Sequence, residues 1–338
     1  MAVPQVPPSI ACVRTWLAAW DLPTPARLRP LAGGFTSHVW RIDAGESVFV
    51  AKLAYQPPAD VDNGLRAAAI LAHHGLRTGP AVPTRDGALT RLIQYPAGQW
   101  HALAVMGFVD GEPLDWRTHG ALRIAGQTLG TMHRVLLEDG SLELPDQLFG
   151  YLLGEAAWGP QPEIQPLIGR AVAAVRAFEA RCPVTYGPIY GDGLQVRVEA
   201  RSGTVGVIDW GTVSHGPLLF DLALAAYAAR RAGHVDLTAL WSSYLAVAPV
   251  QAAELAGLRA YEALLWARSA KYFGYRQKHQ VLLGDPRPGA NAEALARAVT
   301  ALEQVLDAAS SGAAEASEPR PGPDPRASDG TKPGRWRG

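Results

Sequence analysis

The 338-residue sequence has few of the features that secreted and membrane-bound proteins depend on. Its two cysteines, Cys12 and Cys182, lie far apart and form no Cys-x-x-Cys pair, which excludes a disulfide scaffold and a cysteine zinc site. No apolar run reaches the roughly 18 residues needed to span a bilayer, and the N-terminus lacks the pattern of a signal peptide. We therefore expect a cytoplasmic protein with no membrane partner.

The sequence also lacks a net charge, because 31 lysines and arginines balance 31 aspartates and glutamates. A neutral chain offers little attraction to a nucleic-acid backbone, so we expect no nucleic-acid partner. Apolar residues are abundant: hydrophobic residues make up 48% of the chain and charged residues 18%, which is typical of a folded protein. The length allows one large domain or two modest ones.

Hydrophobic patterning divides the chain into four parts. A short helix precedes a region of glycine-bounded strands with one helix, and a longer, mainly helical region with a few short strands follows. A proline-rich tail without large aliphatic residues is expected to be disordered. These parts span residues 1–27, 28–108, 109–308 and 309–338. The pattern predicts an α+β fold with a small antiparallel-sheet lobe followed by a larger α-helical lobe.

Lys52 is the first residue along the chain with a candidate chemical role. It interrupts an apolar strand, Val48–Leu53, that follows the Gly33-Gly34 turn. Because side chains of a strand alternate between its two faces, a lysine there also fits a solvent-exposed position. Beneath a glycine turn whose N–H groups can approach an anion closely, the same lysine is suited to hold phosphate oxygens.

Two carboxylates fall at the open end of one predicted hairpin. Asp192 lies in a turn between two glycines, and Asp209 ends the apolar strand 205–208. Turn chemistry alone accounts for an aspartate between glycines. Phosphoryl transfer, however, requires two such groups, one to orient the attacking hydroxyl and one to hold Mg²⁺. Asp221, at the start of a later helix, fits either helix capping or support of this loop.

Taken in order, the glycine turn, the strand lysine, Tyr-Gly-Asp192, Ile-Asp209-Trp-Gly and Asp221-Leu-Ala resemble the aminoglycoside phosphotransferase family. The resemblance runs from about Leu31 to Lys278. Relatives in that family include choline, homoserine and fructosamine kinases, and all have a bilobal, protein-kinase-like fold. The resemblance implies an ATP-dependent, Mg²⁺-requiring small-molecule kinase, as a monomer or homodimer, that phosphorylates a hydroxyl acceptor.

The resemblance also implies a role for each matched residue. Asp192 would be the catalytic aspartate, Asp209 the principal metal ligand, and Asp221 a brace for the catalytic loop. The adenine would bind to the backbone of residues 106–108. The expected nucleotide contacts are Lys52, Gly33, Gly34, Met106 and Phe108.

Three positions depart from the family pattern. Tyr190 replaces the usual histidine before Gly-Asp, and its hydroxyl can take over part of the hydrogen bonding. Arg197 stands where an asparagine, the second metal ligand, is expected. We prefer Gln195 as that ligand, because it opens the same strand after a shorter loop and offers an amide oxygen. The acidic partner of the strand lysine falls near Arg66, which leaves either Asp62 in a shifted helix register or no partner.

These departures leave other functions open. A non-catalytic pseudokinase that binds a ligand is one alternative, although the retained Asp192 and Asp209 favour an active enzyme. A choline- or homoserine-type metabolic kinase is another, and it differs only in its acceptor. Residues 140–180 and 230–290 show no excess of carboxylates but many aromatic side chains. An antibiotic, or a related metabolite containing a sugar or nucleoside, therefore fits better than a polycationic aminoglycoside.

Overall fold

An antiparallel sheet forms the N-terminal lobe of the computed structural model, which describes residues 7–23, 26–31, 35–96, 98–146, 148–153 and 161–317. Its strand order is β1-β2-β3-β6-β4, and β5 also pairs with β6. β2 and β3 form a hairpin, whose turn contains Gly45 in the left-handed region, with φ of 62°. The strands are β1 (Ala26–Leu31), β2 (Ser37–Ala44), β3 (Ser47–Ala54), β4 (Ala81–Val82), β5 (Thr90–Gln94) and β6 (Trp100–Gly107).

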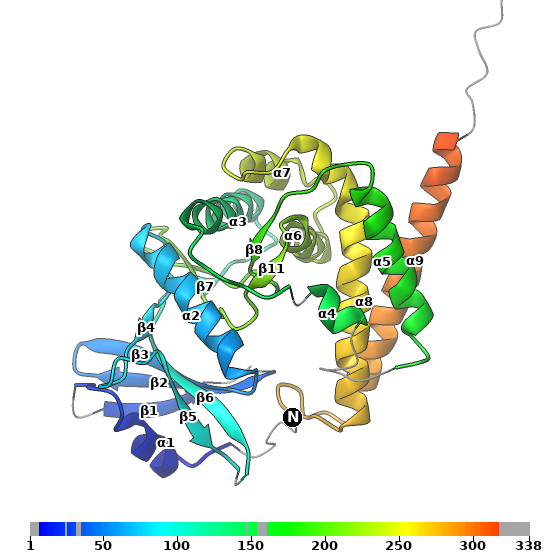
Figure 1. Ribbon diagram of the computed structural model, residues 1–338. Helices are drawn as coiled ribbons and strands as arrows, with labels where there is room; N and C mark the ends of the chain where they lie inside the picture. Colours follow the sequence, from blue (N-terminus) through cyan, green and yellow to red (C-terminus); the bar gives the residue numbers. More distant parts are fainter. Residues whose placement is uncertain are drawn as a thin grey trace, which may run out of the picture.

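Both faces of this sheet are covered, because small and apolar side chains alternate along β3 and β6. On one face, α1 (Ile10–Leu17) packs its buried side chains against Leu53 and Leu103. On the other face, α2 (Pro58–His73) packs against the alanines of the same strands. Figure 1 shows α2 between the sheet and the helical lobe. The helix begins at Pro58, since a proline in the first turn fits helical geometry without needing an N–H partner.

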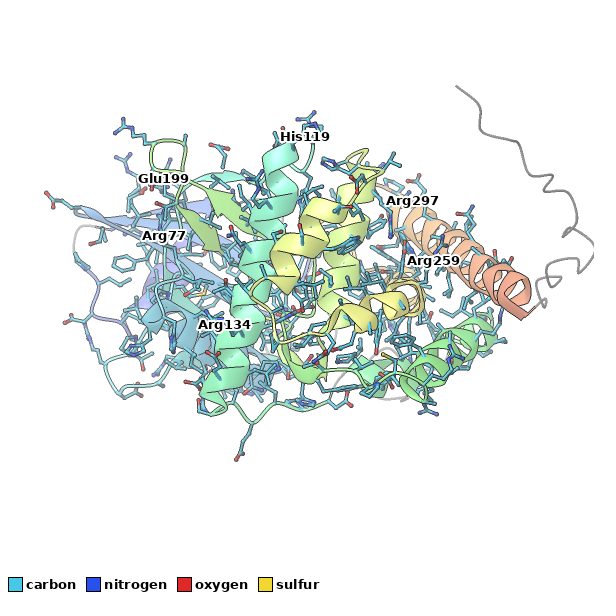
Figure 2. All side chains as sticks on the ribbon, turned by 90° about the horizontal axis from the view of Figure 1, so that it is seen from above. Arg77, His119, Arg134, Glu199, Arg259 and Arg297 are labelled. Carbon is cyan, nitrogen blue, oxygen red and sulfur yellow. The ribbon has the colours of Figure 1, made fainter. Side chains whose placement is uncertain are left out.

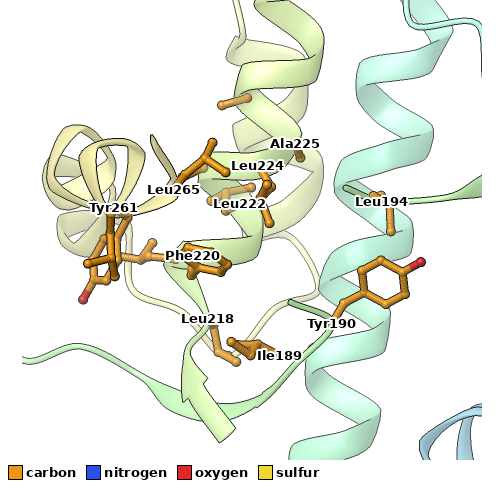
Figure 3. Close-up of a cluster of buried hydrophobic side chains, with 14 of the residues drawn as sticks. Ile189, Tyr190, Leu194, Leu218, Phe220, Leu222, Leu224, Ala225, Tyr261 and Leu265 are labelled. Carbon is orange, nitrogen blue, oxygen red and sulfur yellow. The ribbon is translucent and has the colours of Figure 1, made fainter. Parts of the chain in front are cut away.

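The C-terminal lobe is a larger set of helices around one apolar core. Its central helix, α6, is buried along nearly its whole length and packs against α8, and α9 packs on α8 in turn (Figure 1). Figure 3 shows part of this core, with Ile189 next to Leu218 and with Phe220 near Tyr261. The helices are α3 (His119–Asp139), α4 (Leu148–Leu153), α5 (Gln165–Glu179), α6 (Leu219–Arg231), α7 (Thr238–Leu245), the 3₁₀ helix η1 (Ala252–Gly257), α8 (Leu258–Lys278) and α9 (Ala290–Ser317).

Short strands interrupt the helical lobe and form two small sheets. β8 (Tyr186–Ile189) pairs with β11 (Ser214–Pro217), while β9 (Val196–Val198) pairs with β10 (Val205–Val207) and with β7 (Glu112–Pro113). The sequence patterns did not reveal β4, β7, β11 or α4, because each is too short to show a period. The bilobal α+β architecture is confirmed.

Ion pairing and backbone hydrogen bonds tie the β9–β10 hairpin to the N-terminal lobe. The guanidinium of Arg77, just after α2, lies 3.2 Å from the carboxylate of Glu199, and its carbonyl accepts the N–H of Val207 at 2.8 Å. Figure 2 shows Arg77 and Glu199 next to each other, far from Arg297 on α9. The hairpin is therefore fixed between the lobes.

The last helix, expected to end near residue 308, continues to Ser317 in α9. The remainder of the expected tail, residues 318–338, lies outside the described residues, and the proposed division into four parts stays a prediction. In the part of the chain that the structure describes, no helix is both long enough and apolar enough for a membrane span.

Candidate active site

Asp192, the candidate catalytic residue, lies in the turn between β8 and β9. Gly191, before it, has φ of 76°, and a Cβ atom there would lie 2.5 Å from the carbonyl oxygen of Thr212, so the turn requires glycine. The Asp192 carboxylate accepts the N–H of Gly193 at 2.7 Å and remains accessible to solvent. The turn thus presents this carboxylate at the open end of the β9–β10 hairpin.

A buried carboxylate on α6, that of Asp221, holds the turn in place. Its oxygens accept the backbone N–H of Tyr190 at 2.6 Å and that of Gly191 at 2.8 Å. Nε2 of His133 lies 3.0 Å from the same carboxylate, and Nδ1 of His133 lies 2.8 Å from the hydroxyl of Tyr244. Of the two sequence interpretations of Asp221, these contacts fit support of the loop rather than helix capping.

Tyr190 connects the two candidate catalytic segments. Its hydroxyl donates to the carbonyl of Ile208 at 2.5 Å, and its ring meets Trp210 edge-on with centroids 5.4 Å apart. Burial raises the pKa of Tyr190 well above its ordinary value, so the hydroxyl stays protonated and remains a donor. The Tyr190 hydroxyl therefore links the Asp192 turn to the carbonyl of the residue that precedes Asp209.

Asp209 directly follows this accepting carbonyl and adopts a conformation unusual for a non-glycine residue, with φ of 68°. Such backbone conformations cost ~1–3 kcal/mol and cluster at functional sites. The Asp209 carboxylate is half exposed and lies 2.5 Å from Nζ of Lys52, whose side chain is largely buried. The structure thus brings together Lys52 and Asp209, which lie 157 residues apart in the sequence.

The expected acidic partner for the strand lysine does not come from α2. Asp62 accepts a hydrogen bond from the hydroxyl of Thr90 at 2.9 Å, and Arg66 is exposed. Gly64 of α2 packs directly on this segment: a Cβ there would lie 1.8 Å from the carbonyl oxygen of Trp210. At Gly64 the helix backbone therefore packs on the backbone that follows Asp209, and no side chain fits between them.

Of the two positions considered for the second metal ligand, that of Gln195 lies nearer to Asp209. The carbonyl of Gln195 accepts the N–H of Ile208 at 3.1 Å, which places Gln195 beside the residue that precedes Asp209. Arg197 pairs with Gly206, two positions farther along the strands, or about 7 Å away. The Gln195 side chain is exposed.

The expected phosphate-binding turn, Gly33-Gly34, lies outside the described residues, but its neighbour Thr36 is described. The Thr36 hydroxyl accepts a hydrogen bond from Nε2 of Gln56 at 3.0 Å. Gln56 in turn lies close to Lys52, because a Cβ on Gly211 would lie 2.9 Å from Nε2 of Gln56 and 3.6 Å from Nζ of Lys52. Oε1 of Gln56 is buried without a hydrogen-bond partner among the described residues, and no sequence motif marks this residue.

The segment expected to bind adenine is the end of β6 and the residues after it. Met106 lies within the sheet, and the N–H groups of Gly107 and Phe108 donate to neighbouring backbone carbonyls at 3.0 and 3.1 Å. The next N–H group, that of Val109, donates to no acceptor among the described residues. The available donor therefore lies one residue beyond the expected range 106–108.

Surrounding protein atoms and nearby charges set the acidity of Asp192. Desolvation by these atoms raises the pKa of its carboxyl group above the usual range, and the charge of Asp209 adds to this effect. Arg268 of α8 is the strongest opposing influence, followed by the N–H of Gly193 and by Lys52. Sequence patterns did not identify Arg268 as a site residue, because no motif contains it.

The N-terminal lobe is a sheet whose lysine faces a helical lobe, and one carboxylate lies in the turn before the β9–β10 hairpin while the other follows its second strand. This arrangement is that of a protein-kinase-like fold. The family model for the phosphotransferase enzyme family matches residues 27–264, and the chain belongs to this family. No curated protein matches the chain.

Solved structures with the same fold cover most of the chain. A microcompartment-associated aminopropanol kinase has 18% sequence identity and a TM-score of 0.68, over 91% of this chain and 98% of that one. An amicoumacin kinase in complex with AMP-PNP and Ca²⁺ has 14% identity and a TM-score of 0.66, over 89% and 94%. The choline kinase LicA from Streptococcus pneumoniae has 12% identity and a TM-score of 0.58, over 87% and 98%.

Proposed function

We propose that this chain is an ATP-dependent O-phosphotransferase that phosphorylates a hydroxyl group of a small molecule. The observation that carries the proposal is the convergence of Asp192 with the Lys52–Asp209 pair at one end of the β9–β10 hairpin. Support comes from the buried Asp221 carboxylate, which fixes the Asp192 turn through two backbone N–H groups.

Asp209 and Gln195 have the chemistry to hold Mg²⁺ together with the phosphates of ATP. Both offer oxygen ligands, and Mg²⁺ is often held by one or two protein groups plus phosphates and water. The half-exposed carboxylate of Asp209 and the exposed Gln195 side chain fit this donor set. When bound, the cation would neutralise charge on the phosphate oxygens. Lys52, which pairs with Asp209 in this structure, would contact the α- and β-phosphates.

Asp192 would orient the acceptor hydroxyl and take its proton as the new bond forms. The acceptor oxygen attacks the γ-phosphorus in line, the bond from phosphorus to the β-γ bridging oxygen breaks, and ADP leaves. The adenine would bind to the backbone at the end of β6, near the N–H of Val109.

The acceptor we favour is an antibiotic or a related metabolite that contains a sugar or a nucleoside. Antibiotic resistance is then the expected biological role, and the cytoplasm the expected location. The similar structures named above are kinases of aminopropanol, amicoumacin and choline, so the fold serves acceptors of several kinds. The balanced charge of the chain supports an acceptor that is not a polycation.

The proposal is tested by coupled ADP release over a panel of hydroxylated antibiotics, sugars and nucleosides, with Asp192→Ala as the control. At least one acceptor should raise ADP release in the wild type and not in the variant, whereas equal rates in both would refute the proposal. Thermal-shift titration with ATP tests the pseudokinase alternative, because an active kinase should be stabilised more when Mg²⁺ is present. Asp209→Asn should remove that metal-dependent part.

A further inference from the structure

Arg268 extends from α8 to the catalytic turn. Its Nη1 group donates a hydrogen bond to the carbonyl of Gly191, the residue before Asp192. Its guanidinium carbon lies 5.7 Å from the ring centroid of Phe220, which is fully buried in α6. The side chain is thus held at the turn by one hydrogen bond and one ring contact.

Most of the hydrogen-bonding capacity of Arg268 is left unused. A guanidinium carries five N–H donors, and only the bond to Gly191 engages Arg268 among the described residues. Arg276, two helical turns farther along α8, is a contrasting case because it is buried and fully engaged. The acceptors of Arg276 are Phe35, Tyr272, Asn291, Val281 and Leu283.

The charge of Arg268 likewise has no ion-pair partner among the described residues. No carboxylate lies within ion-pair distance of Arg268 in the part of the chain that the structure describes. The charged groups that act on Asp192 are Arg268, Asp209 and Lys52, and the last two pair with each other. Glu262, the acidic residue of α8, is paired with Arg230 at 2.7 Å. The α8 side of the catalytic turn therefore presents a cation with free donors.

A supporting role explains the hydrogen bond to Gly191, and the charge of Arg268 also favours the ionised form of Asp192, but neither contact uses the remaining N–H donors of the guanidinium. A neutral side chain can donate to a carbonyl equally well, whereas a guanidinium also matches carboxylate and phosphate oxygens in a two-pronged geometry. An ammonium group on the acceptor, placed at the same point, would be repelled by Arg268.

We propose that Arg268 binds an anionic group, a carboxylate or a phosphate, on the alcohol that Asp192 activates. The acceptor class is then alcohols that carry a negative charge near the reacting hydroxyl, in preference to amino alcohols. This inference rests on the proposed phosphotransferase function. It names the acceptor chemistry, and it leaves the transfer step as given above: the hydroxyl proton passes to Asp192 and the phosphoryl group to the acceptor oxygen.

Three probes with the same three-carbon skeleton test the proposal: glycerate, glycerol and aminopropanediol. Binding to the ATP-loaded wild-type protein is measured by thermal-shift titration, and turnover is measured by ADP release. Glycerate should bind at least ~10-fold more tightly than aminopropanediol, as expected for hydrogen bonds between charged groups. Equal binding of the two, or no binding of glycerate, overturns the proposal.

Variants of Arg268 separate anion binding from support of the turn. Arg268→Gln should lower kcat/KM for glycerate ~10- to 100-fold more than it lowers kcat/KM for glycerol, and Arg268→Lys should recover part of that difference. Arg259→Gln, at an exposed position on the same helix far from the N-terminal lobe, is the matched control and should change neither value (Figure 2). An equal loss for glycerate and glycerol in Arg268→Gln would assign Arg268 to support alone.

The failure of this inference is distinguishable from the failure of the proposed function. If the wild type transfers phosphate to other alcohols but shows no preference that depends on Arg268, only the inference fails. If neither the panel nor the probes raise ADP release above that of Asp192→Ala, the phosphotransferase function itself fails.

Discussion

Replacing Asp221 by asparagine tests how firmly the catalytic turn depends on one buried carboxylate. The change keeps the size of the side chain and removes its charge and one acceptor oxygen. The carboxylate accepts two backbone N–H groups at 2.6 and 2.8 Å and contacts Nε2 of His133 at 3.0 Å. Hydrogen bonds to a charged group contribute ~1.5–3 kcal/mol, and a buried N–H left without an acceptor costs ~1–3 kcal/mol.

An amide oxygen can still serve one of the two N–H groups, so the expected loss is ~2–4 kcal/mol in the free energy of unfolding. Turnover should fall as well, by about 100-fold, because small displacements of a catalytic group have effects of this size. Stability is measured by urea denaturation and turnover by ADP release.

Asp236→Asn is the matched control. Asp236 is exposed and accepts two hydrogen bonds from Thr238, at 2.8 and 2.6 Å, where an asparagine serves almost as well. This variant should behave like the wild type. If Asp221→Asn is as stable and as active as Asp236→Asn, the support assigned to Asp221 is wrong.

Three further predictions concern other contacts. Gly64→Ala should destabilise the protein by ~2 kcal/mol or more in urea denaturation, since its Cβ would overlap the backbone of Trp210. Gly169→Ala, in an open position of α5, is the control and should stabilise the protein by ~0.5–1 kcal/mol. Equal effects of the two substitutions would contradict the packing of α2 on Trp210. Burial lowers the pKa of His101, so the unfolded chain binds more protons, and the free energy of unfolding should decrease as the pH falls below about 6.5. His101→Phe should make the free energy of unfolding less dependent on pH in this range. The same pH dependence in the variant and the wild type would refute the role of His101. Arg276→Met should raise KM for ATP and lower the melting temperature. The reason is that Nη1 of Arg276, on α8, donates at 3.2 Å to the carbonyl of Phe35, which follows the glycine turn in the sequence. An unchanged KM for ATP would refute this link.

Much of the fold was predictable because its signals are local. Gly45 marks a hairpin turn, the strands 38–43 and 47–53 show β-branched residues, and the long helices show apolar residues at helical spacing. The two-residue strands β4 and β7 carry no such signal. They form because β6 and β9 offer unpaired edges, which only the tertiary arrangement creates.

The candidate site was predictable where a motif keeps its residues close together in the sequence. Asp192, Asp209 and Asp221 were found through their neighbours, and the structure places all three around one hairpin and one helix. The partner of Lys52 was not predictable, since counting along α2 does not reveal that Gly64 packs against the backbone of Trp210.

Arg268 escaped sequence reasoning for a different reason. It lies 77 residues from Gly191 in the sequence, and it reaches the catalytic turn only because α8 packs against α6. An arginine on a half-buried helix resembles any other surface arginine until its contacts are known.

Transfer of the γ-phosphoryl group itself is the most direct test of the central claim that Asp192 and Asp209 form a phosphotransferase site. Labelled ATP is incubated with the wild type and with Asp192→Asn, in the presence of the best acceptor from the panel, and the phosphorylated acceptor is measured by mass spectrometry. We expect labelled product with the wild type and at least ~100-fold less with the variant. Equal product from both proteins, or none from the wild type with any acceptor, would contradict the claim.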